Sequence, residues 1–328
     1  MKDKTSYKEA VNSKIFHVIA QASKELNIDS YVIGGFVRDL LLKRKFKKDI
    51  DIVAVGSGIE LALKVSEMLP KKPKVQVFKT YGTAMLRFED TEIEFVGARK
   101  ESYHFESRNP VVENGTLEDD QNRRDFTINA LAISLNEANF GELVDPFNGL
   151  SDLELKIIKT PLNPDITFSD DPLRMMRAIR FAAQLNFDIE EESLKAIERN
   201  RERIKIISGE RIVDELNKIL MTDKPSIGFL LLHQTKLLHI ILPELTALEG
   251  VDESEGQTHK DNFYHTLEVV DNIAPNTDDV WLRWAALLHD IGKAPTKRHH
   301  KKTGGRFTAM NLLAEKWSRN YLKGFICH

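Results

Sequence analysis

The sequence contains a single cysteine, Cys327, among its 328 residues. One thiol excludes a disulfide framework and a four-thiolate zinc site, and a shortage of cysteine is typical of proteins from a reducing compartment. Long apolar runs are missing too, because no stretch of about 18 uncharged apolar residues occurs and the charged first residues contain no apolar signal core. The sequence therefore predicts a soluble, cytoplasmic protein without a membrane-spanning segment.

Charge of one sign is not in excess either. The 47 Lys plus Arg residues oppose 50 Asp plus Glu residues, which leaves a net charge of −3. A nucleic-acid-binding surface would therefore have to be a local patch. Two basic runs are candidates for such a patch, and a solvated, solubilising surface is the competing interpretation for any one lysine. The runs are Lys43, Arg44, Lys45, Lys47 and Lys48, and then Lys71, Lys72, Lys74 and Lys79.

The hydrophobic pattern changes near residue 169. Before this point, segments with the period of a strand alternate with segments of helical period, whereas almost everything after it has helical period. About 150 residues per domain predicts two domains. We expect an α+β fold, in which a mixed sheet with helices precedes an all-α region. The clearest expected elements are helices at 14–26, 36–43, 59–68, 191–201, 209–221, 226–238, 263–272 and 280–288, and strands at 49–55 and 92–96.

A pair of glycines, Gly34 and Gly35, lies between an expected strand and an expected helix. Glycines in such a turn let backbone N–H groups approach a phosphate, and the helix N-terminus adds partial positive charge. Arg38, one turn into the helix, can reach a triphosphate. The competing interpretation is an ordinary helix start in which Arg38 and its neighbour Asp39 lie on a solvated face.

Two carboxylates, Asp49 and Asp51, follow in an expected strand. Residues i and i+2 of a strand project to the same face, so each acid should raise the pKa of the other unless a cation intervenes. Mg²⁺ prefers oxygen ligands of this kind. An exposed turn with two acids is the alternative, but the apolar residues at 50, 52 and 53 favour a buried strand.

These motifs and three later ones together resemble the class II tRNA nucleotidyltransferases, or CCA-adding enzymes, and the related bacterial poly(A) polymerases. The five segments are 34–39 with 49–51, 123–130, 145–149 with 152–153, 170–174, and 210–216. Their order along the chain is the specific part of the signal. Asp170 departs from the family, which usually has glutamate there. The resemblance implies a polymerase β-like nucleotidyltransferase head, followed by a helical neck and body.

The resemblance also implies roles for individual residues. Asp49 and Asp51 would bind two Mg²⁺ ions, with Glu94 as a third carboxylate and Glu92 as the competing choice. Arg123 and Arg124 would contact phosphate, and Asp125 would accept a hydrogen bond from a ribose hydroxyl. The residues at 145–153 would form a flexible segment. An ordinary surface ion pair between positions 124 and 125 is the alternative from the residues alone.

The implied nucleobase reader is Asp171 with Arg174. Three residues apart on a helix, an acceptor and a donor would lie on one face and could match the edges of C and A. Arg177, one turn further, would hold the pair or touch the triphosphate. A plain i,i+3 salt bridge is the competing interpretation.

A third constellation consists of His265, His289 and Asp290. Histidine and aspartate brought together from two helices are typical of a divalent-ion site. The stretch 282–293 resembles the HD domains of metal-dependent phosphohydrolases. That pattern needs a further aspartate downstream, and none follows Asp290. We therefore expect an incomplete HD-like segment with a truncated, out-of-frame end.

The sequence thus predicts a nucleotidyltransferase head at 1–148, a base-selecting neck at 149–222, a helical body at 223–250 and a partial HD-like domain at 251–328. The expected activity is addition of C and A to the 3′ end of tRNA from CTP and ATP. An enzyme that adds only A, or poly(A), is the alternative within the family. A metal-dependent phosphohydrolase and a non-catalytic RNA-binding module are the alternatives outside it.

Overall fold

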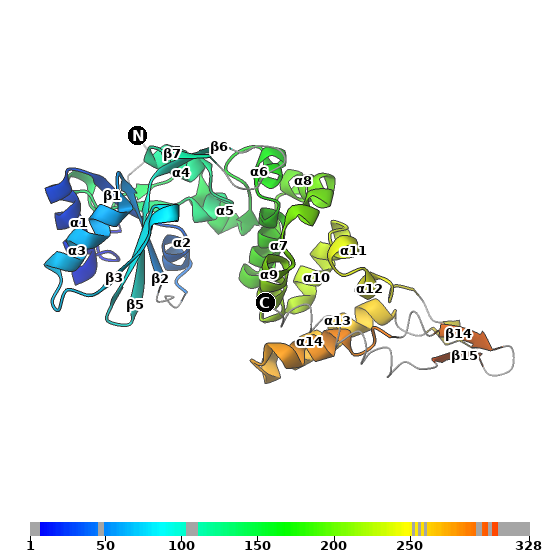
Figure 1. Ribbon diagram of the computed structural model, residues 1–328. Helices are drawn as coiled ribbons and strands as arrows, with labels where there is room; N and C mark the ends of the chain where they lie inside the picture. Colours follow the sequence, from blue (N-terminus) through cyan, green and yellow to red (C-terminus); the bar gives the residue numbers. More distant parts are fainter. Residues whose placement is uncertain are drawn as a thin grey trace. The chain divides into compact units, whose positions relative to one another are not determined.

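The computed structural model describes residues 7–44, 49–102, 111–250, 253–254, 257–258, 261–292, 297–300 and 304–307. The chain divides into two compact units, Met1–Asp170 and Asp171–His328. Figure 1 labels their elements along the chain. Within the described residues, no helix combines the length and the apolar character needed to cross a membrane.

The first unit is built on a seven-stranded mixed sheet with the order β3-β4-β5-β2-β1-β8-β9. The central strands β2 and β5 are parallel, and their neighbours pair antiparallel. The strands are β1 (Asp29–Ile33), β2 (Asp49–Val55), β3 (Val75–Phe78), β4 (Thr83–Phe88), β5 (Thr91–Gly97), β8 (Ala132–Ser134) and β9 (Leu143–Val144). This arrangement confirms the expected α+β fold.

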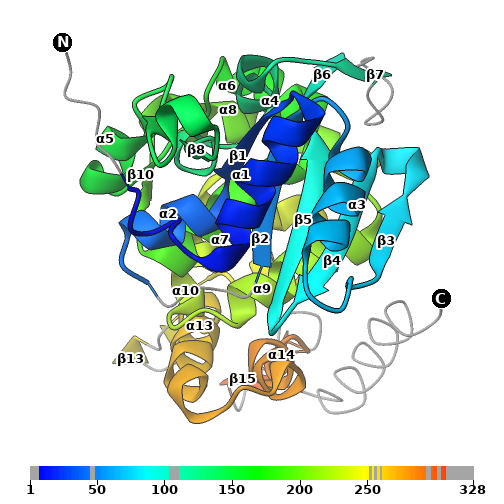
Figure 2. The same cartoon turned by 90° about the vertical axis from the view of Figure 1, so that its left-hand side faces the viewer.

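Two helices, α1 (Lys14–Leu26) and α3 (Gly58–Met68), pack together on one face of this sheet, as Figure 2 shows. Apolar side chains of the central strands lie beneath them, and Ile52, Ile93 and Phe95 are completely buried. Alternation along β2 therefore directs the intervening acids to the other face. The unit also contains α2 (Gly35–Leu41), β6 (Arg99–Ser102), β7 (Val111–Asn114), α4 (Leu117–Asn122), α5 (Gly149–Leu155), β10 (Ile157–Ile158) and α6 (Pro164–Asp170).

The first unit continues past the expected head boundary at residue 148. A side chain at Gly149 would collide with the Thr127 carbonyl oxygen at 2.5 Å, so the start of α5 packs directly on the short helix η2 (Thr127–Asn129). The Thr127 hydroxyl also donates to Asp152 at 2.6 Å. Because of these contacts, the structure places residues 149–170 with the sheet.

The second unit is helical. Its elements are α7 (Leu173–Leu185), β11 (Asp188–Ile189), α8 (Glu191–Asn200), α9 (Gly209–Leu220), α10 (Pro225–Gln234), α11 (Leu238–Ile241), α12 (Pro243–Thr246), α13 (Asn262–Ile273) and α14 (Val280–Leu288), with the short strand pairs β12 (Glu253–Ser254) with β13 (Gln257–Thr258) and β14 (Lys297–His300) with β15 (Gly304–Phe307). The helix expected at 226–238 is two helices, because Lys236 has a φ of 61° and breaks the ladder.

The buried side chain of Arg283 joins α14 to the preceding helices. Its guanidinium donates to the carbonyl oxygens of Leu220 at 2.6 Å, Thr222 at 2.9 Å and Ala274 at 2.6 Å. Trp284 donates to Asn217 on α9 at 2.6 Å. The expected partial domain at 251–328 is therefore attached to the body through α13 and α14, and residues 308–328, with the expected out-of-frame end, lie outside the described residues.

Candidate active site

The turn between β1 and α2 lies against one of the strand acids. Gly34 has a φ of 80°, and a Cβ atom there would lie 3.3 Å from Asp51 Oδ2 and 3.2 Å from Arg124 Nη1. Only glycine adopts this conformation without strain, and a side chain there would crowd both neighbours. The structure therefore brings the expected phosphate turn, a strand acid and one of the expected arginines to one place.

The acids lie on two neighbouring strands. Asp49 and Asp51 project from the same face of β2, and the parallel register pairs Asp49 with Glu92 and Asp51 with Glu94 on β5. Burial raises the pKa of the Asp51 carboxyl above its ordinary value, the Arg124 guanidinium opposes that shift, and Glu94 and Asp49 add to it. Because Glu94 lies opposite Asp51 and its charge acts on that carboxyl, it is favoured over Glu92 as the third carboxylate.

This group of carboxylates suits a hard cation. Its donors are all carboxylate oxygens, and the neighbouring acids that raise the pKa of Asp51 would repel one another less with a cation among them. The donor set therefore fits Mg²⁺. Among the described residues, Asp49, Asp51 and Glu94 are not gathered as tightly as the histidine-containing group described below. The assignment of Glu94 stays a prediction.

Arg38, expected to reach a triphosphate, lies beside the phosphate turn, with Nη2 3.7 Å from where a Cβ at Gly35 would lie. Its side chain is only 4% exposed. The guanidinium donates to Asp39 through Nε at 2.9 Å and to Asn129 through Nη1 at 2.8 Å. These bonds join α2 to η2 through Arg38 and hold it next to the phosphate turn, and its expected contact with the triphosphate stays a prediction.

Arg123 and Arg124 are held by one buried acid that the sequence reasoning missed. Asp120 is fully buried on α4, pairs with Arg123 through Oδ1, and accepts from Arg124 Nε at 3.0 Å through Oδ2. A capping box between Thr116 and Asp119 begins that helix. Paired guanidiniums held by a buried carboxylate are pre-oriented for a phosphate ligand. An acid three and four residues before the two arginines was the available signal in the sequence.

Asp125 takes part in a second buried network. Its Oδ1 accepts from its neighbour's backbone N–H at Phe126, at 2.9 Å, and from Asn129 Nδ2 at 3.0 Å. Asn129 in turn accepts from Arg38. Asn129 was not singled out in the sequence, yet it connects two of the expected nucleotide-binding residues. The ribose-binding role of Asp125 stays a prediction.

The segment expected to be flexible is anchored at both ends of its motif. Asp145 accepts from the backbone N–H groups of Gly149 at 2.7 Å and Leu150 at 3.0 Å. Asp152 accepts from Thr127. These bonds begin α5 and attach it to η2, so the motif has a structural function within the first unit.

Asp171 and Arg174 do not share a helix as expected. Helix α7 begins at Leu173, and Asp171 precedes it, accepting from the Leu173 backbone N–H at 3.2 Å. The Asp171 Oδ2 atom also lies 3.8 Å from Nη2 of Arg211 on α9. Asp171 is therefore held at the start of α7 by a backbone group and by a residue of the fifth motif. The i,i+3 helical pair is replaced by a contact between motifs.

Further along α7, a buried ion pair attaches this helix to α9. Arg180 Nε lies 2.6 Å from Glu215 Oε2, and both side chains are less than 10% exposed. The guanidinium of Arg180 also stacks 3.9 Å from the centre of the Phe181 ring, and that of Arg177 lies 5.4 Å from the same centre. These contacts place Arg177 beside an aromatic ring on α7, and its expected contact with a nucleotide stays a prediction.

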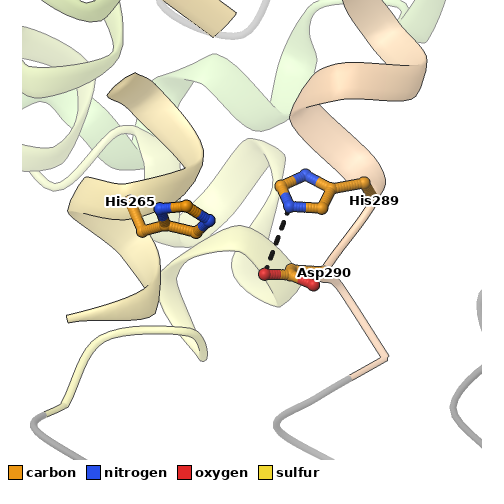
Figure 3. A group of neighbouring side chains, drawn as sticks. All are labelled: His265, His289 and Asp290. Atoms are coloured by element: carbon orange, nitrogen blue, oxygen red, sulfur yellow. Dashed lines mark ion pairs between the residues drawn. The ribbon is translucent and has the colours of Figure 1, made fainter. Parts of the chain in front are cut away.

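The HD-like residues do converge. His265 on α13 and His289 and Asp290 after α14 offer ligand atoms that all lie within 4.8 Å of one another (Figure 3). His289 Nε2 lies 3.2 Å from Asp290 Oδ2, and its Nδ1 lies 2.7 Å from the Ala286 carbonyl oxygen. The second contact orients the ring in the way that a metal-binding histidine needs. Two imidazoles and a carboxylate fit a divalent transition metal.

Comparison with known protein families finds three matches in order along the chain. A profile described as "Poly A polymerase head domain" matches residues 30–159, one described as "Probable RNA and SrmB- binding site of polymerase A" matches 186–249, and one described as "HD domain" matches 262–325. The last match supports the expected HD-like segment, but it extends to residue 325 and so does not fit the expected out-of-frame end.

Among curated relatives, the A-adding tRNA nucleotidyltransferase of Aquifex aeolicus is 36% identical over 244 residues, which are 74% of this chain and 28% of that protein. The CCA-adding enzyme of Bacillus velezensis is 35% identical over 283 residues, 86% of this chain and 64% of that protein. This chain thus spans less than two thirds of the length of either relative.

Solved structures of tRNA nucleotidyltransferases are also similar to this chain. A tRNA nucleotidyltransferase complexed with a primer tRNA and an incoming ATP analog has a TM-score of 0.65 and 30% identity, covering 82% of this chain and 74% of that one. The CCA-adding enzyme of Bacillus stearothermophilus in complex with CTP has a TM-score of 0.67 and 28% identity, covering 85% of this chain and 63% of that one. The chain belongs to the family of tRNA nucleotidyltransferases and poly(A) polymerases.

Proposed function

We propose that this protein is a template-independent RNA nucleotidyltransferase that adds C and A to the 3′ end of tRNA from CTP and ATP and releases pyrophosphate in the cytoplasm. The observation that carries the proposal is the meeting of Asp51, Arg124 and the Gly34 turn in a chain of this family. The relatives named as CCA-adding enzymes, and the neighbour solved with tRNA and an ATP analog, support the substrates.

The head residues would divide the work between the reacting groups. Asp49 and Asp51, with Glu94, would hold Mg²⁺, and two ions at such a cluster stabilise both the attacking and the leaving oxygen of an in-line displacement. Arg124, with the Gly34 turn, would hold the triphosphate. Positioning and neutralisation of charge would supply most of the rate enhancement, because phosphoryl chemistry asks for little covalent participation by the protein.

The base would be selected in the second unit. A carboxylate at Asp171 accepts hydrogen bonds and a guanidinium at Arg174 donates them, so together they could pair with C or A and mismatch G and U. The contact between Asp171 and Arg211 would keep the carboxylate in place before a nucleotide arrives. The same pair would serve both nucleotides in turn.

Nucleotide-by-nucleotide extension tests this function. The substrate is a tRNA that lacks its last three nucleotides, incubated with CTP alone, ATP alone, or both. We expect extension with CTP alone and completion only when ATP is added. Incorporation of A without any C would contradict CCA addition and favour an A-adding enzyme, as the Aquifex relative is named, or a poly(A) polymerase.

A second candidate function belongs to His265, His289 and Asp290, whose ligand atoms are already gathered. We propose that they bind a divalent transition metal and serve a phosphohydrolase activity. In an Asp49→Ala/Asp51→Ala background, titration with Mn²⁺ should show a site that His265→Ala weakens at least about tenfold and that a control change of the exposed His17 leaves alone. Phosphate release should persist in that background and disappear with His289→Ala. Equal Mn²⁺ binding by the His265→Ala variant and the His17 control variant would refute the site.

A further inference from the structure

The sheet face that carries the acids continues, uncovered by α1 and α3, to the free edge of the sheet. Register pairs Asp51 with Glu94, Glu94 with Met85 and Met85 with Gln76, so these four side chains share one face. Three strand spacings of about 4.8 Å place Gln76 about 14 Å from Asp51. Figure 2 shows β3 at the outer edge, beyond β4 and β5.

This edge of the sheet is strongly exposed. Glu94, Gln76 and Phe78 are exposed on the acid-bearing face, and Phe78 retains 43% of its accessible surface. Tyr81, in the following helical turn η1 (Lys79–Tyr81), retains 67%. Two large aromatic side chains therefore lie in solvent at the β3 edge, and Phe78 is on the face that carries the carboxylates.

The charged side chains of the segment around β3 are all basic. Residues 70–82 contain four lysines and no acid. Among the described residues, none of the four lysines forms an ion pair with a carboxylate. Lysines on an edge strand also discourage pairing with another chain, but that function does not require exposed aromatic rings. Lysines interspersed with aromatic side chains are instead typical of surfaces that bind single-stranded nucleic acid. The lysines are Lys71, Lys72, Lys74 and Lys79.

We propose that this β3 edge, residues 71–81, binds the RNA strand that carries the reacting 3′ hydroxyl. Lys74 and Lys79 would contact backbone phosphates, and Phe78 and Tyr81 would stack with unpaired bases. The open sheet face would then lead the strand toward Asp51. Both kinds of contact are independent of sequence, as an enzyme that meets many tRNA ends requires. The inference rests on the proposed function, because it assigns the RNA contact of that same site.

The test measures affinity for tRNA lacking its last three nucleotides, by fluorescence anisotropy in EDTA and without nucleotide. Phe78→Ala/Tyr81→Ala should weaken binding about tenfold or more, since each stacked base contributes about a factor of five or greater. Lys74→Ala/Lys79→Ala should lower the salt slope of log K by about 1.4 to 1.8. Lys71 and Lys72 are left unchanged because their φ angles are 65° and 41°.

Matched controls come from the opposite face of the sheet. Lys14→Ala/Lys24→Ala removes two exposed lysines from α1 and should leave the salt slope of log K within about 0.3 of the wild-type value, well below one phosphate contact. CTP binding, measured without RNA, should be unchanged in every variant and reports that the head is folded. If the aromatic double variant does not fold, Tyr81→Ser alone keeps the test, because that side chain is the more exposed of the two.

Three results separate the possible outcomes. Wild-type RNA affinity in the aromatic variant would overturn the inference. So would a change in self-association by light scattering with RNA binding intact, because the edge would then pair with another protein chain. A wild-type protein that binds RNA but adds neither C nor A would contradict the proposed function, while weakened RNA binding in the edge variants would still support this surface.

Discussion

Replacing Asp51 by asparagine is expected to abolish nucleotide addition, with a fall in kcat of about 10³-fold or more. The amide keeps the shape of the side chain but removes the charge that the reaction needs beside the Gly34 turn. Asp51 lies close to that turn, because a Cβ atom added at Gly34 would lie 3.3 Å from Asp51 Oδ2. A residue that only orients a metal ligand would cost about 10- to 100-fold. The measurement is single-turnover extension of shortened tRNA with saturating CTP.

Glu92→Gln is the matched control. Glu92 is exposed on the same strand and face as Glu94, but register places it opposite Asp49. We expect this variant to retain most of the activity and Glu94→Gln to lose much of it. An Asp51→Asn protein that still extends tRNA at a rate near wild type would remove the proposed reaction centre.

The Asp51→Asn variant should be more stable than the wild type in EDTA at neutral pH. Burial raises the pKa of Asp51, and the neighbouring acids Glu94 and Asp49 add to that effect, so the ionised carboxylate destabilises the folded state. Between the ordinary carboxyl pKa of 3.8 and the raised value, the folded protein holds more protons than the unfolded chain. Stability due to this group therefore falls as pH rises through that window.

Urea unfolding at two pH values measures this effect. The advantage of Asp51→Asn should be full above the raised pKa and should disappear below the ordinary pKa, where residue 51 is neutral in both proteins. This readout also shows that lost activity does not come from lost folding. A variant less stable than the wild type at neutral pH would mean that Arg124 already compensates the charge of Asp51.

The second large effect is expected from Asp171→Ala, which should lower kcat/KM for CTP and ATP by about 10²-fold and weaken rejection of UTP and GTP. A site built to hydrogen-bond its substrate discriminates strongly because a mismatched partner leaves buried polar groups unpaired. Removing the acceptor beside Arg174 removes that discrimination. The measurement is incorporation of each of the four nucleotides in competition.

Lys195→Ala supplies the control for the second unit. Within the part of the chain that the structure describes, Lys195 pairs only with the exposed Glu191 on α8, at 2.6 Å, so its removal should change neither rate nor nucleotide choice. The effect of Arg211→Ala on rate and nucleotide choice should lie between the effects of Asp171→Ala and Lys195→Ala. This variant removes the partner of the Asp171 carboxylate but leaves that acceptor in place. Unchanged nucleotide preference in Asp171→Ala would contradict base selection by this residue.

Local structure was predicted from the sequence in considerable detail. The helix expected at 14–26, the strand expected at 49–55 and the helix expected at 280–288 have those bounds in the structure as α1, β2 and α14. Periodicity is a short-range property, since a helix or strand repeats its apolar residues within a few positions. The family, too, could be identified from short motifs in order along the chain.

The contacts between those motifs could not be predicted. Arg38 meets Asn129 across 91 positions, and Arg180 meets Glu215 across 35. Asp171, expected in a helical pair with Arg174, lies before the helix and meets Arg211 instead. Which acid faces which guanidinium depends on strand register and helix packing, and both are set by contacts distant in sequence.

By itself, then, the sequence determined the elements, their order and the residues that carry charge, because backbone hydrogen bonding and apolar periodicity act over a few residues. Only the tertiary structure decided that Arg38 is buried and donates to Asn129, and that the acid-bearing face of the sheet stays open to the edge at β3. Pairing of distant charged groups depends on long-range packing, which no local pattern records.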